Sequence, residues 1–124
     1  MPTQESWINH TTLFIDMTSP LTSSDLSVCF KKVAREVANS KEQIDILADV
    51  TKAGLIPVDA PVLAIHAGFL TDPHLKNVAV AGSSQWARFL GRIATRRSNK
   101  PIEFYETFEQ AAYALGLSED AQVE

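Results

Sequence analysis

The sequence predicts a single α/β domain with a four- or five-stranded, mostly parallel (mixed) sheet and about four helices. Two observations predict this class. Short runs of apolar, β-forming residues alternate along the chain with longer segments whose apolar residues recur every three or four positions. The length of 124 residues fits one domain and leaves little room for a second.

Composition excludes several other classes. Hydrophobic residues make up 45% of the chain and charged residues 21%, as in ordinary globular proteins. The formal net charge of -4 argues against a nucleic-acid partner, which needs a basic surface. No apolar run approaches the ~20 residues of a membrane span, and the first residues lack the basic and apolar regions of a secretory signal. Cys29 stands alone, which excludes an intrachain disulfide and favours a reducing, cytoplasmic setting.

The folded domain is expected to cover residues 11–116. Residues 1–10 are polar apart from Trp7 and Ile8, and they are assigned to a flexible tail, with a short leading strand as the alternative. Residues 117–124 are acidic and are assigned to a second flexible tail.

The first strand–helix–strand unit follows the tail. Residues 11–17 contain an apolar, β-forming run, and residues 23–39 place their apolar residues on one helical face behind a serine expected to cap the helix. Cys29 belongs to that face, so a buried, inert thiol is expected rather than a nucleophile. Residues 44–50 form the next strand, and this order predicts a right-handed crossover and parallel pairing.

The second unit begins after a loop rich in proline and glycine. Asp59 is expected to cap a helix whose inner face includes Val62 and His66. A histidine in this setting is expected to be a packed, hydrogen-bonded structural residue. Residues 77–81 are nearly all small or branched and apolar, which predicts a central strand covered on both faces.

Carboxylates mark the ends of two predicted strands. Asp49 ends the 44–50 strand with Thr51 two positions on, and Asp16 lies near the end of the first strand. Ligands of open α/β sheets bind beyond the carboxyl ends of the strands. Asp49 and Thr51 are therefore candidate ligand-binding residues, and Asp16 either shares their edge or lies on a solvated side.

A turn after the 77–81 strand provides a second candidate. Gly82, Ser83 and Ser84 open the next predicted helix, an arrangement that points free backbone N–H groups at a bound anion. The turn lacks the dinucleotide fingerprint and the phosphate-loop lysine, so a tight turn with a serine cap is the structural alternative. If the turn binds an anion, the chain is a small anion- or nucleotide-binding protein or enzyme.

The helix after this turn has the densest cationic feature of the chain. Arg88, Arg92 and Arg96 recur every four residues and form a stripe along one side. The stripe is either a solvated helix face or a surface that docks a partner, whether an acidic protein or a second copy of the chain.

The chain closes with a strand and a helix. Residues 102–105 are expected to form a strand nearer the sheet edge, Thr107 and Gln110 to form a capping box, and Gly116 to end the last helix. No metal cluster, cofactor motif or nucleophile–base pair can be assembled from the sequence, so no catalytic residue and no cofactor is expected.

The order of elements over residues 11–116 resembles the STAS superfamily, in particular its SpoIIAA-like branch of small bacterial α/β proteins mostly of unknown function. Three stretches support the resemblance, and their order and spacing matter more than any one of them. They are Ile46–Thr51, Asn77–Trp86 and Phe104–Ala112.

The resemblance implies a non-enzymatic cytoplasmic regulatory or binding module. Its ligand would be a protein partner, a second copy of the chain, or a small apolar molecule held in an internal cavity. The best-known branch is phosphorylated on a serine in an Asp-Ser-(Ser/Thr)-Gly motif. Here Asp49 precedes Val50-Thr51, and the motif is absent. That departure disfavours the same phospho-switch on Thr51, Ser83 or Ser84.

Overall fold

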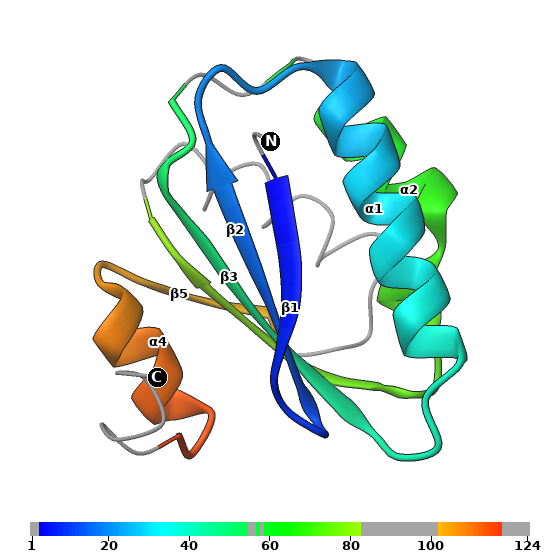
Figure 1. Ribbon diagram of the computed structural model, residues 1–124, viewed down its shortest axis with the longest axis vertical. Coiled ribbons are helices and arrows are strands. Elements are labelled where there is room, and N and C mark those ends of the chain that lie inside the picture. Colours follow the sequence, from blue (N-terminus) through cyan, green and yellow to red (C-terminus); the bar gives the residue numbers. More distant parts are fainter. Residues whose placement is uncertain (1–2, 55–56, 58, 83–101, 118–124) are drawn as a thin grey trace.

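The computed structural model describes residues 3–54, 57, 59–82 and 102–117 (Figure 1). It contains a five-stranded sheet in the order β1-β2-β3-β4-β5. The strands are β1 (Thr3–Asn9), β2 (Thr12–Thr18), β3 (Ile44–Lys52), β4 (Leu75–Ala81) and β5 (Ile102–Tyr105). β1 pairs antiparallel with β2, and every other neighbouring pair is parallel. This confirms the expected mixed, mostly parallel sheet, and residues 102–105 form an outer strand among the strands described.

Helices cover both faces of the sheet. They are α1 (Ser23–Ala38), α2 (Ala60–Ala67), the 3-10 turn η1 (Phe69–Thr71) and α4 (Phe108–Ala114). α1 and α2 lie on one face and α4 on the other (Figure 1). The strands follow one another across the sheet, so successive right-handed crossovers place their helices on the same face, whereas α4 follows the last strand and is free of this constraint. The helix expected after residue 83 lies outside the described residues.

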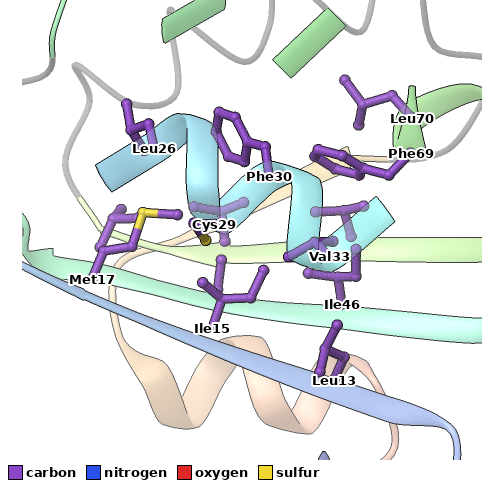
Figure 2. Packing of buried hydrophobic residues seen from close by; sticks show 14 of the residues in the cluster. Leu13, Ile15, Met17, Leu26, Cys29, Phe30, Val33, Ile46, Phe69 and Leu70 are labelled. Carbon is purple, nitrogen blue, oxygen red and sulfur yellow. The ribbon is translucent and has the colours of Figure 1, made fainter. Parts of the chain in front are cut away.

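The main core fills the space between the sheet and the α1–α2 layer. Alternate residues of β2 and β3 point toward α1, as the two-residue period of a strand requires. Ten residues of this core are labelled in Figure 2: Leu13, Ile15, Met17, Leu26, Cys29, Phe30, Val33, Ile46, Phe69 and Leu70. Cys29 has no exposed surface, which confirms its expected burial.

A second, smaller core lies beneath α4. Leu47, Ala79 and Ala81 of the sheet pack against Ala111 and Ala112 of the helix. The small alanine side chains let α4 approach the central strands closely. The last four residues of β4, Val78 to Ala81, are all buried, so the expectation of a strand covered on both faces is confirmed.

At the amino terminus the domain begins earlier than residue 11, and the alternative of a short leading strand is the one that forms. Residues 3–9 are not a tail but form β1, which pairs with β2 along its length. The positions of β1 that face α1 are Thr3, Glu5 and the partly exposed Trp7 rather than aliphatic residues, so the strand has no apolar alternation on that side. At the other end, Leu117 is buried, and the domain includes it.

Two helix details also differ from expectation. Thr22 caps α1 and forms a capping box with Asp25, because the threonine stands three residues before that carboxylate; the serine expected as cap lies inside the helix. On α2, Val62 is 51% exposed and His66 is exposed, so neither of these two residues faces the core as expected. Leu63 packs on the main core instead.

The last helix forms as the sequence predicts. Thr107 caps α4, Gln110 completes the capping box, and Gly116 follows with φ of 81°, the left-handed conformation that glycine tolerates best. Among the described residues, no helix is long and apolar enough to cross a membrane.

Candidate functional site

The two strand-end carboxylates lie side by side. Asp16 and Asp49 occupy the same register position on the neighbouring strands β2 and β3. Ile15 and Met17 point into the main core, so Asp16 between them points to the opposite face, the one that α4 partly covers. Both carboxylates are partly exposed. The structure thus brings Asp16 to the edge where Asp49 was expected.

Asp49 and Thr51 engage each other. One oxygen of Asp49, Oδ1, accepts hydrogen bonds from the Thr51 backbone N–H at 3.0 Å and from its hydroxyl at 2.6 Å. The carboxylate therefore holds the end of β3 in place. Aspartate side chains commonly accept a hydrogen bond from the backbone N–H two residues further on. A phosphate on Thr51 would also meet the charges of Asp16 and Asp49, which repel it.

Close packing against Val50 explains the glycine at position 82. A Cβ atom at this position would lie 2.2 Å from Cγ2 of Val50, far inside van der Waals contact. The Gly82 N–H donates to the Tyr105 carbonyl at 3.0 Å, so it closes the β4–β5 ladder and does not face a ligand. Ser83 and Ser84 lie outside the described residues.

The charge at this edge is negative. Ala81, the residue before Gly82, is in register with Asp49, so an anion near the turn would lie close to that carboxylate. In the described part of the chain, no three His, Cys, Asp or Glu side chains gather as metal ligands would. The arginine stripe of Arg88, Arg92 and Arg96 lies outside the described residues.

A second feature, which was not predicted, is a groove beside β5 and α4. It has a volume of about 610 Å³. We call it the β5–α4 groove; its lining residues are Phe104, Tyr105, Glu106, Glu109, Gln110, Tyr113 and Ala114. Three aromatic side chains and two exposed carboxylates are among its lining residues.

Tyr113 is the most conspicuous residue of this groove. It is 81% exposed, a high value for an aromatic side chain. It stands one helical turn after Glu109 on the same side of α4, so the ring and the carboxylate are neighbours. The exposure of Tyr113 could have been predicted from the sequence, because this aromatic residue falls outside the apolar stripe formed by the buried Ala111 and Ala112.

A smaller cavity of about 190 Å³ lies under the end of α4. Its lining includes Asn77, Glu103, Tyr105 and Leu115. Lost hydration and the adjacent Glu103 carboxylate raise the pKa of Tyr105, so its hydroxyl remains a donor to Glu103. Asn77 is held by Asp45, whose carboxylate accepts its amide N–H at 3.1 Å. Tyr105 lines both this cavity and the groove.

A polar cluster lies on the other face, between β1 and α1. The Glu5 side chain is only 6% exposed, and its Oε1 lies 3.2 Å from Lys32 Nζ. Its second oxygen, Oε2, is buried without a hydrogen-bond partner. Burial, and then the Glu5 charge, raises the pKa of Cys29 well above its usual value. This thiol is therefore protonated and inert.

These features define a small α/β protein of SpoIIAA-like fold, which confirms the fold that the sequence resemblance implied. A solved structure shares it: an uncharacterised protein of the DUF3478 family from Shewanella loihica PV-4, described as having a SpoIIAA-like fold. The two chains are 19% identical, and the match covers 91% of each with a TM-score of 0.65. No family model matches the sequence, and no curated protein matches it.

Proposed function

We propose that this chain is a non-catalytic cytoplasmic regulatory module that binds peptide segments of partner proteins through the β5–α4 groove. The groove supports this most directly, because it is large enough for several side chains and is walled by aromatic rings. Tyrosine is among the residues that contribute most to protein interfaces, and Tyr113 exposes its ring to solvent at this site.

The strand-end edge supports binding less well. The Asp49 oxygen Oδ1 is already bound to Thr51, and the Gly82 N–H is bound within the sheet. A polar group that already has its partner gains little from a ligand. The negative charge of Asp16 and Asp49 also opposes an anion or a nucleotide at this place.

A small apolar ligand is also disfavoured relative to a peptide. Such a ligand gains most from an enclosed apolar site. The β5–α4 groove has two carboxylates among its lining residues, and the cavity below α4 is lined in part by Asn77 and Glu103. The cytoplasmic assignment is supported by Cys29, a free buried thiol of the kind that persists in reducing compartments.

Selection of displayed random peptides on the immobilised protein tests the proposal. We expect peptides to be enriched and to bind the Tyr113→Ala variant at least about tenfold more weakly, because the variant removes an aromatic contact. Val28→Ala is the matched control, since Val28 is 59% exposed on α1. Failure to enrich any peptide, or equal losses in both variants, would overturn the proposal.

A further inference from the structure

We infer that the ligand of this module is an extended basic segment, which adds to β5 as a sixth strand and places its cationic side chains in the β5–α4 groove. The inference rests on the proposed function and specifies the chemistry of the partner. Four observations support it: the direction of the β5 backbone, the protection of the opposite sheet edge, the charge of the groove, and the alternation of the two faces of β5.

The β5 backbone presents hydrogen-bonding groups outward. The Tyr105 carbonyl accepts from Gly82 N–H, so the peptide groups of Tyr105 face β4. Neighbouring residues of a strand point their N–H and C=O groups to opposite sides. Phe104 therefore points its backbone donor and acceptor away from β4, toward the side where the sheet of described strands ends. A strand laid along that side can pair with both groups.

The opposite sheet edge is protected against such pairing. β1 has a register irregularity between Trp7 and Asn9, and Trp7 is tied to α1 through a hydrogen bond from its indole N–H to Glu36 at 2.8 Å. β1 also directs the charged side chain of Glu5 inward to Lys32. Irregular pairing and inward charges are devices that prevent strand addition at edges. β5, the other outer strand, shows neither device in its described residues.

The groove beside β5 selects positive charge. Glu103 on β5, Glu106 in the turn and Glu109 on α4 are all exposed, and no lysine or arginine is among the described residues that line the groove. A lysine or arginine that enters it meets the Glu109 carboxylate and the face of the Tyr113 ring together. Carboxylates and tyrosine rings both attract cations, the ring through its quadrupole.

The two faces of β5 favour a partner strand in which basic and apolar residues alternate. Tyr105 points to the α4 face, whereas Phe104 points to the opposite face and packs on the main core. Side chains of an added strand alternate in the same way. Basic residues on the groove side and apolar residues beside Phe104 therefore give the best match. A second copy of β5 fits poorly, because it brings further glutamates to an acidic groove in a chain of net charge -4.

The test uses a synthetic probe, acetyl-Lys-Val-Lys-Val-Lys-Val-Lys-amide, with binding measured by calorimetry on the full chain at low salt. We expect saturable 1:1 binding that a glutamate–valine peptide of the same length does not show. Glu109→Lys should weaken the probe at least about tenfold, because attraction becomes repulsion. Glu42→Lys is the control of equal charge, since the Glu42 side chain is 60% exposed and does not line the groove.

Two methylated probes test strand addition itself. One probe is methylated on the backbone nitrogens of its lysines and the other on the backbone nitrogens of its valines. Each has therefore lost the backbone N–H groups along one edge. Only one edge faces β5 in an added strand. We expect one methylated probe to bind at least about tenfold more weakly and the other to bind like the parent.

Four results would overturn the inference. These are no binding of the basic probe, equal binding of the acidic probe, equal binding of both methylated probes, and dimerisation of the free protein through β5. None of the first three affects the peptide selection, whose random library is not restricted to basic sequences. The proposed function can therefore hold while this inference fails.

Discussion

Phe14 of β2 and Phe108 of α4 meet edge to face, with ring centroids 5.4 Å apart and ring planes inclined at 78°. The pair fixes α4 on the face of the sheet opposite α1. Because α4 supplies one wall of the β5–α4 groove, this contact also fixes the position of Tyr113. The groove is thus a consequence of how the second core packs.

Replacing Phe108 should therefore loosen the groove wall. We expect Phe108→Ala to lower the free energy of unfolding by about 2 kcal/mol, since it removes a partly buried ring and an aromatic pair. Urea denaturation measures this loss. Tyr113→Ala removes a ring of similar size from the same helix but from solvent, and should cost under about 0.5 kcal/mol. Equal losses would show that α4 is not anchored by the phenylalanine pair.

The sequence predicted four of the five strands because each has an apolar run or alternation that its neighbours complete. β1 was only the alternative to a tail, since Glu5 points inward and is compensated by Lys32, a residue on a distant helix. No local pattern reveals such a pair. On α2, Val62 and His66 share helical spacing with buried positions, but the core is completed by Leu63 and by η1.

Of the two candidate sites, the sequence predicted one in part and did not predict the other. Asp49 could be placed at the edge where the parallel strands end, whereas the sequence left Asp16 either at this edge or on a solvated side. The β5–α4 groove could not be predicted, because the apolar stripe of α4 fits either face of the sheet equally well. Its position depends on a tertiary contact between Phe14 and Phe108, which lie 94 residues apart in the sequence (108 minus 14).

The Glu5–Lys32 pair gives an asymmetric prediction. Lys32→Met should cost about 1–2 kcal/mol of unfolding free energy, because it leaves a buried carboxylate without its counter-charge. Glu5→Met should cost less, since it removes the buried charge itself and the unpaired Oε2 with it. The double variant should be more stable than Lys32→Met alone. If Glu5→Met were the costlier single change, the pair would contribute net stability, contrary to this account.

Cys29 gives the chain a defined response to alkaline pH. Its folded-state pKa is raised, so folding favours the protonated thiol. That stabilisation is complete below the unfolded pKa near 9.0 and is lost as the pH rises above it. We expect the unfolding free energy to fall between pH 9 and 10.5 by up to about 1.4 kcal/mol per pH unit from this group. Cys29→Ala should lack this component, and parallel curves for the two proteins would refute it.

The claim that the β5–α4 groove is the binding surface is tested most directly by NMR. Nitrogen-15-labelled protein is titrated with a peptide selected against it, and backbone amide shifts are followed. The account predicts the largest shifts at Tyr105, Glu109 and Tyr113, with Asp49 and Thr51 unchanged. Shifts concentrated at Asp49 and Thr51, with the groove residues silent, would contradict it.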